Sequence, residues 1–127
     1  MISRIIASAA ICCGLVCVWF GSAKAQLTSR DSSVNQSARV LFEQAQKAIK
    51  GSSYAEARSL LETLINTHPD SEYVPRAKLS IADSWYSERA FKQAELEYRD
   101  FLTFFPNRPE VAEAQRRIDS IHQKASF

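Results

Sequence analysis

Hydrophobic residues recur at helical spacing from residue 37 almost to the end of the chain, and short polar breaks separate the periodic segments. This pattern predicts five helices, over residues 37–50, 54–67, 74–87, 91–105 and 110–123. Gly51 is expected to end the first helix in a left-handed conformation, and Ser53 and Glu56 to cap the second. Pro69 ends that second helix. Because the connections are short, consecutive helices are predicted to be antiparallel neighbours in an all-α fold.

The chain also repeats itself when it is shifted by 37 residues. After this shift, residues of the same chemical type occupy the same positions, whether small, large and apolar, or turn-forming. The matched residues are Ala45 and Ala82, Ala57 and Ala94, Leu61 and Tyr98, Leu64 and Phe101, Pro69 and Pro106, and Val74 and Val111. Alanines at matched positions of two successive helices allow a close approach between them. The repeat therefore predicts paired helices that pack through small residues.

This arrangement resembles the tetratricopeptide repeat, in which small and aromatic residues alternate at fixed places before a proline. The second unit has Ala82, Trp85, Ala94, Tyr98 and Pro106 at those places, and the first has Ala45, Ala48, Ala57, Leu61 and Pro69. The resemblance implies an antiparallel helix-hairpin α-solenoid of about two and a half repeats over residues 37–127. An unrelated helical bundle with an ordinary core is the alternative.

Residues 1–25 have the three parts of a secretory signal, and an N-terminal signal helix is expected there. Arg4 precedes an uncharged apolar run, and Ala23 and Ala25 form a small-x-small site, so cleavage is predicted between Ala25 and Gln26. The alternative is an uncleaved anchor, since the apolar run approaches the ~20 residues that span a bilayer. The predicted location is the periplasm, with association to the outer membrane through an uncleaved signal or a lipid as a further option.

All three cysteines lie in the apolar run. A lipidated cysteine usually follows a small residue, whereas Cys17 follows Val16, and Cys12 and Cys13 follow Ile11 and Cys12. These cysteines are therefore interpreted as small hydrophobic residues of the signal, with lipidation as the alternative.

Composition limits the function of the remainder. Residues 26–36 are polar and are predicted to be a tether. Two of the 16 basic residues, Arg4 and Lys24, lie in the signal, which leaves 14 basic against 14 acidic residues. A chain without a basic surplus is not expected to bind nucleic acid through phosphate contacts.

The segment from Ala38 to Gln123 resembles the N-terminal repeats of BamD-like outer-membrane assembly lipoproteins. The resemblance is carried by "YAEARSLLETLINTHPDSEYVPRAKLSIADSWY" and "AELEYRDFLTFFPNRPEVAEAQ". It implies a non-enzymatic scaffold that binds other envelope proteins, namely barrel-assembly components. Members of that family carry about five repeats, so a truncated or minimal relative is expected. Periplasmic repeat adaptors of the Tol-Pal and cell-division system, which bind peptidoglycan-associated proteins, are the nearest alternative, followed by a generic exported binding module.

No catalytic group, metal site or cofactor is predicted. Outside the signal the chain has two histidines, His68 and His122, without recognisable partners, and it has no glycine-rich phosphate loop.

The predicted binding surface is the concave face lined by the first helix of each pair. Its side chains would be Arg39, Phe42, Gln46, Arg76, Leu79, Asp83 and Tyr86. Exposed aromatic, leucine and arginine side chains are typical of a binding patch, although a face without a partner fits the pattern as well. Since solenoids usually need about three repeats, either a weakly stable monomer or completion by a partner is expected.

Overall fold

The computed structural model describes residues 32–127. The chain divides into two compact units, Met1–Val34 and Asn35–Phe127, and only the last residues of the first unit are described. The predicted signal, its cleavage between Ala25 and Gln26, and most of the tether lie outside the described residues. Within residues 32–127, no helix is both long enough and apolar enough to cross a bilayer.

The described residues form five helices and contain no strand. A first helix includes residues 32–50, and α2 (Tyr54–Thr67), α3 (Val74–Ser87), α4 (Phe91–Phe104) and α5 (Val111–Ala125) follow. The prediction of an all-α, tetratricopeptide-like architecture is confirmed. The expected tether is wrong for residues 32–36, which are helical and extend the first helix toward the N-terminus.

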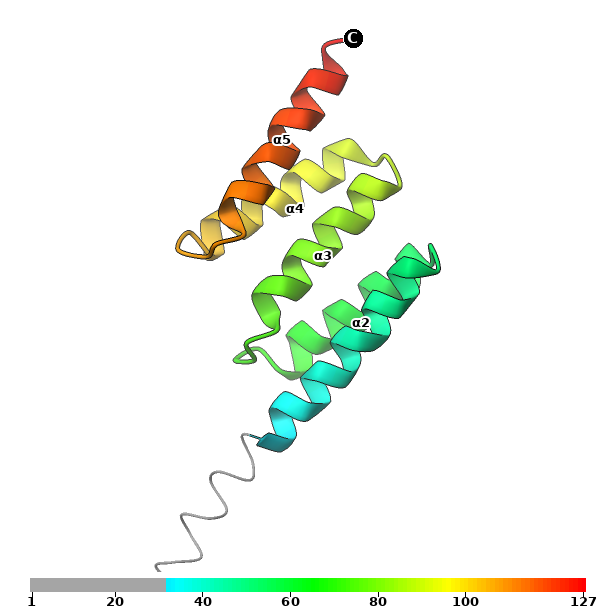
Figure 1. Cartoon of the computed structure of the whole chain (residues 1–127), viewed down its shortest axis with the longest axis vertical. Coiled ribbons are helices and arrows are strands. Elements are labelled where there is room, and N and C mark those ends of the chain that lie inside the picture. Colours follow the sequence, from blue (N-terminus) through cyan, green and yellow to red (C-terminus); the bar gives the residue numbers. More distant parts are fainter. Residues whose placement is uncertain (1–31) are drawn as a thin grey trace, which may run out of the picture. The chain divides into compact units, whose positions relative to one another are not determined.

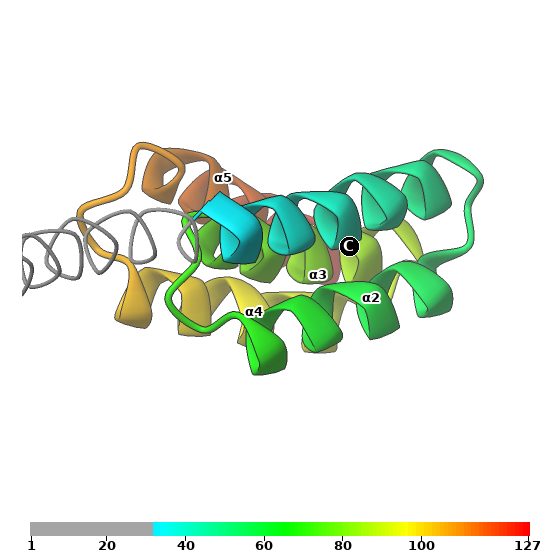
Figure 2. The ribbon, with the colours of Figure 1, turned by 90° about the horizontal axis from the view of Figure 1, so that it is seen from below.

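The helices of Asn35–Phe127 alternate between two layers. Each helix packs antiparallel against the next one along the chain (Figure 1). The first helix, α3 and α5 form one layer, and α2 and α4 form the other (Figure 2). We call the former the first-helix layer, because its members open the successive pairs.

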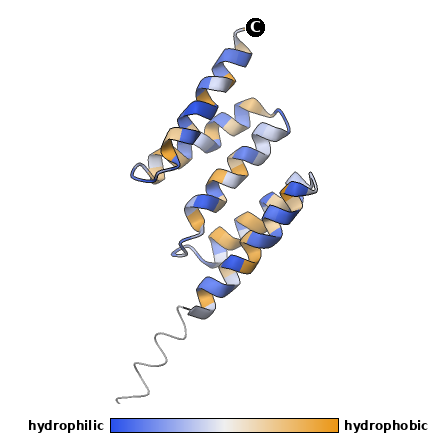
Figure 3. Cartoon of the chain, in the orientation of Figure 1, coloured by the Kyte–Doolittle hydropathy of each residue, from blue (hydrophilic) through white to orange (hydrophobic). Residues whose placement is uncertain are grey.

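Two hydrophobic clusters fill the space between the layers. The first consists of Ala38, Phe42, Ala45, Leu61, Leu64, Val74, Ala77 and Ile81, and the second of Ala82, Ala94, Tyr98, Phe101, Ala114, Ile118 and Ile121. Trp85 and Phe105 are partly buried and pack against both clusters. Each helix carries hydrophobic as well as hydrophilic positions (Figure 3), as expected for helices with one buried side.

The small residues of the repeat are buried. Ala45, Ala57, Ala82 and Ala94 are completely buried, and Ala82 and Ala94 belong to the same cluster. Pro69 and Pro106 lie exposed in the turns that follow α2 and α4.

The backbone of the turns repeats at the same 37-residue interval. Ser52 (φ 60°) and Arg89 (φ 63°) are both left-handed. The next amide donates back to Ala48 O at 2.9 Å in the first turn, and to Trp85 O at 3.0 Å in the second. This pairing is that of a Schellman motif, which satisfies carbonyl groups at the end of a helix. The two units therefore share their turn geometry as well as their apolar pattern.

Two predicted caps are wrong. Gly51 has no positive φ, because the left-handed residue of this turn is Ser52, one position later. Ser53 is the N-cap residue of α2 but makes no side-chain cap hydrogen bond, so the box with Glu56 does not form. The second unit has Ala90 at the equivalent place, which shows that this junction does not depend on a capping side chain.

Arg58 of α2 joins the two helix pairs. Its guanidinium carbon lies 3.6 Å from the ring centre of Trp85, and its Nη1 contacts Glu88 Oε2 at 2.7 Å. The side chain of Arg58 is only 11% exposed, so this ion pair is screened less than the surface pairs.

The left-handed conformation of Ser52 can be tested by substitution. In the folded state, replacing Ser52 by Gly removes the ~1–2 kcal/mol cost of a left-handed conformation at a residue with a side chain. Glycine also makes the unfolded chain more flexible, which offsets ~0.5–1 kcal/mol of this gain. We expect Ser52→Gly to raise the free energy of unfolding by ~0.5–1 kcal/mol in a urea titration. Ser53→Gly, at a residue with φ −86°, is the control and should lower it. A loss of stability in Ser52→Gly would contradict the assigned turn.

Candidate binding site on the first-helix layer

Arg39 and Gln46, predicted from the first unit, both make polar contacts on this layer. Arg39 pairs with Glu43 at 2.7 Å, and both side chains are more than half exposed. Gln46 donates from Nε2 to Ser80 Oγ of α3 at 3.0 Å. Arg39 therefore remains accessible, whereas Gln46 joins the first helix to α3.

Phe42 is buried, although it was predicted to be exposed. Its side chain is only 6% exposed and belongs to the first cluster. The ring of Tyr73 lies 5.5 Å from it, and the guanidinium of Arg76 lies 4.8 Å from its ring centre. The prediction of Phe42 as an exposed contact residue is wrong for this chain, because Tyr73 and Arg76 cover it; Arg76 itself is exposed.

Leu79 and Asp83 of α3 are half-buried. Leu79 packs against the second cluster. Asp83 accepts a hydrogen bond from Tyr98 Oη and lies 4.0 Å from Arg117 Nε. Burial raises the pKa of Asp83 above its ordinary value, although the bond from Tyr98 and the charge of Arg117 act in the opposite direction. Burial, reinforced by Asp83, raises the pKa of Tyr98 as well.

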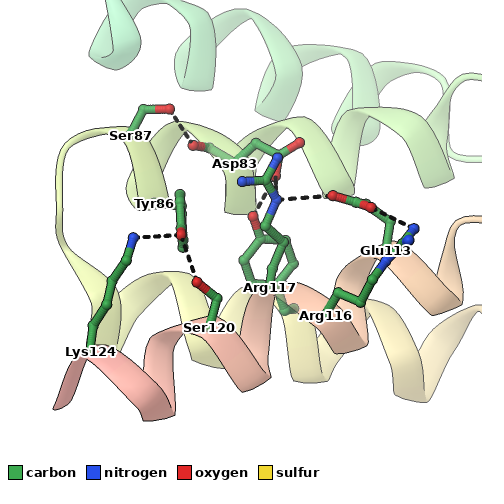
Figure 4. Close-up of polar contacts among 9 residues, drawn as sticks. Asp83, Tyr86, Ser87, Glu113, Arg116, Arg117, Ser120 and Lys124 are labelled. Carbon is green, nitrogen blue, oxygen red and sulfur yellow. Dashed lines mark hydrogen bonds and ion pairs between the residues drawn. The ribbon is translucent and has the colours of Figure 1, made fainter. Parts of the chain in front are cut away.

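Tyr86 is surrounded by polar groups from α5 (Figure 4). Lys124 donates to its hydroxyl at 2.7 Å, and the same hydroxyl lies 3.1 Å from Ser120 Oγ. Arg117 lies over its ring, 5.0 Å from the centre. The hydrogen bond from Lys124, followed by that with Ser120, lowers the pKa of Tyr86 because both stabilise the phenolate.

A pocket of about 580 Å³ opens beside Tyr86. Its lining comes from α3, the turn to α4, the start of α4, and α5: Tyr86, Ser87, Arg89, Phe91, Arg117 and Lys124. The rings of Tyr86 and Phe91 meet edge to face at 5.5 Å. The lining thus combines aromatic surface with three cationic side chains.

The contribution of α5 and of Arg89 was absent from the sequence-based set. Ser120, Arg117 and Lys124 belong to α5, which contributed no residue to the predicted surface. A second shift by 37 residues would have found Ser120, which falls at the position of the predicted Asp83. It places Arg117 at the position of Ser80, which was not in the predicted set. The contact of Gln46 with Ser80 between the first helix and α3 thereby corresponds to that of Asp83 with Arg117 between α3 and α5.

The structure gives the histidines ordinary surroundings. His122 Nε2 lies 2.9 Å from Glu95 Oε1 on the surface, and His68 is the C-cap residue of α2. Among residues 32–127, no group of three or more His, Cys, Asp or Glu side chains is arranged to hold a metal ion.

The paired helices, their buried alanines and their repeated turns define a tetratricopeptide-type helical-repeat protein. The family model of the YfiO outer membrane lipoproteins matches residues 34–116, and the chain belongs to this family. No curated protein matches the chain. The match covers the first helix and α2 to α4 but stops within α5, before Arg117, Ser120 and Lys124.

The contact between Lys124 and Tyr86 is testable by titration. Lys124→Met removes the donor to the phenolate, so the pKa of Tyr86 should rise toward its ordinary value of about 10. Ser120→Ala should cause a smaller rise, because its hydrogen bond is the weaker of the two influences. Tyrosine ¹³C NMR resolves the four tyrosines during the titration. An unchanged pKa of Tyr86 in Lys124→Met would contradict this geometry.

Proposed function

We propose that this protein is a non-enzymatic scaffold that binds other envelope proteins at the periplasmic side of the outer membrane, as a component of β-barrel assembly. The supporting observation is the combination of the family match with an accessible first-helix layer. Arg39 and Arg76 are exposed on it at equivalent places of the two repeats, and the pocket beside Tyr86 adds aromatic and cationic surface.

The arrangement of the titratable side chains favours a binding function over a catalytic one. Asp83 and Tyr98, whose pKa values burial raises, bond to each other and pack into the junction between α3 and α4. They act there as structural partners. A repeat surface of this kind binds by presenting many moderate contacts along its length.

Export is part of the proposal. The signal over residues 1–25, cleaved between Ala25 and Gln26, delivers the domain to the periplasm, and the polar residues that follow, up to the first helix, act as its tether. Anchoring to the outer membrane then depends on the partner, or on a lipid or uncleaved signal. The family match does not include the cysteines of the apolar run.

Site-specific photo-crosslinking in intact cells tests the proposed surface. A crosslinking amino acid is placed at Arg39 or Arg76 on the first-helix layer. Matched controls carry it at Glu62 or Arg99, which are exposed, 37 residues apart and on α2 and α4. We expect adducts with barrel-assembly components from residues 39 and 76, at least about fivefold stronger than from the controls.

Equal adducts from both layers would contradict the assignment of the binding face. Adducts confined to peptidoglycan-associated proteins would replace the barrel-assembly role by that of an envelope adaptor. Absence of any protein adduct from the first-helix layer would remove the scaffold proposal.

A further inference from the structure

The pocket beside Tyr86 continues into a second one around the turn between α3 and α4. The second has a volume of about 560 Å³ and is lined by Arg89, Ala90, Phe91, Lys92, Gln93 and Leu96. Arg89 and Phe91 line both pockets, so the two adjoin. We call their combined lining the Arg89 surface.

The Arg89 surface is cationic. It contains Arg89, Lys92, Arg117 and Lys124, and no Asp or Glu lines either pocket. The chain after its predicted signal has equal numbers of acidic and basic residues, so this surface departs from the average composition. Such a concentration of one charge attracts a ligand of the opposite charge.

The charges of three of these side chains are not neutralised within the chain. In the described residues, Arg89 and Lys92 make no ion pair, and Lys124 donates to the neutral hydroxyl of Tyr86. Arg117 is different, since Glu113 Oε1 lies 3.1 Å from its Nε.

Nearby carboxylates already have partners. Glu88 contacts Arg58 at 2.7 Å, and Glu95 contacts Arg99 at 2.6 Å and His122 at 2.9 Å. The free cationic groups of the surface therefore have no competing carboxylate in its lining.

Apolar surface lies between the cations. Leu96 is 50% exposed and lines the second pocket together with Phe91, whose ring lies 5.5 Å from that of Tyr86. Lys124 Nζ lies 4.6 Å from the ring centre of Tyr86 and 5.1 Å from that of Phe91. A bound peptide of a few residues would therefore contact both positive charges and apolar surface.

We infer that the Arg89 surface binds an extended acidic segment of a partner protein, in which carboxylate and apolar side chains alternate along the face that contacts the surface. This inference rests on the proposed scaffold function and specifies the chemistry of the partner. The guanidinium of Arg89 can bind a carboxylate through two parallel hydrogen bonds, and Lys124 adds a second positive charge. An apolar side chain between the two carboxylates packs on Phe91 and Leu96. Vesicles of anionic phospholipids, which also offer negative charge beside apolar groups, are the alternative ligand in the test.

Binding of a defined peptide to the full chain tests the inference. The probe is an end-blocked peptide of repeated Glu-Glu-Leu-Leu units, which places glutamate and leucine alternately on each face of an extended chain. Its control has glutamine in place of every glutamate. Isothermal titration at low and physiological salt measures both affinities. We expect the glutamate peptide to bind at least about tenfold more tightly, which corresponds to about 1.4 kcal/mol, and its affinity to fall as salt rises.

Arg89→Gly with Lys124→Met should lower the affinity for the glutamate peptide about tenfold. Arg89 occupies a left-handed position that glycine prefers, so its replacement does not threaten the fold. The matched control joins Ser52→Gly, at the equivalent turn position, with Lys50→Met on the first helix. It should bind within about twofold of the original chain, since it leaves the Arg89 surface intact.

Equal binding of the two peptides, or an unchanged affinity in the Arg89→Gly and Lys124→Met variant, would overturn the inference. Binding to anionic phospholipid vesicles but not to the glutamate peptide would also overturn it, in favour of a lipid surface. If crosslinking from residues 39 and 76 persists while the peptide fails, the acidic-segment inference is lost and the scaffold function survives. Loss of the crosslinks alone removes the scaffold function without affecting the peptide result.

Discussion

The close approach of paired helices through buried alanines is the constraint on which the rest of the structure depends. Ala82 of α3 and Ala94 of α4 are completely buried in one cluster with Tyr98 and Phe101. A methyl group at these positions leaves room for the neighbouring backbone, while the large rings fill the space to either side. This packing fixes the spacing within a pair, and thereby the positions from which Asp83, Tyr86 and Arg89 extend.

The successive repeats share a backbone geometry but carry different side chains at equivalent positions. The turns that end the first helix and α3 have nearly identical φ angles and equivalent hydrogen bonds. On that common frame, the neutral contact between Gln46 and Ser80 becomes a charged one between Asp83 and Arg117. Ser52 likewise becomes Arg89 at the left-handed position. The contact between α3 and α5 is therefore charged, whereas the equivalent contact between the first helix and α3 is neutral.

Periodicity predicted the fold well. The bounds of α2 and α3 agree with the prediction, and those of α4 and α5 differ by one or two residues at an end. Local turn chemistry was less informative: a left-handed residue was assigned to Gly51 because glycine prefers that conformation, whereas hydrogen bonding in the turn places it at Ser52. The helical start of the first helix was missed because polar residues 32–36 lack the apolar periodicity that marks a packed helix.

The binding surface was predictable only in part. Asp83 and Tyr86 follow from the repeat, but burial of Phe42 depends on the ring of Tyr73 and the guanidinium of Arg76, which lie about one repeat away in sequence. The Arg89 surface joins a turn residue to the end of α5, and no motif within a single helix reveals that junction. Tertiary packing, which brings α5 against α3, supplies the missing information.

Urea unfolding of Ala94→Leu is the most direct test of the alanine packing. Overpacking at this buried position should lower the free energy of unfolding by ~1–3 kcal/mol. The control is Ala112→Leu, at an exposed position of α5, where the change should stay within about 0.5 kcal/mol. Equal stability of Ala94→Leu and the original chain would show that the paired helices do not depend on a small residue at their contact.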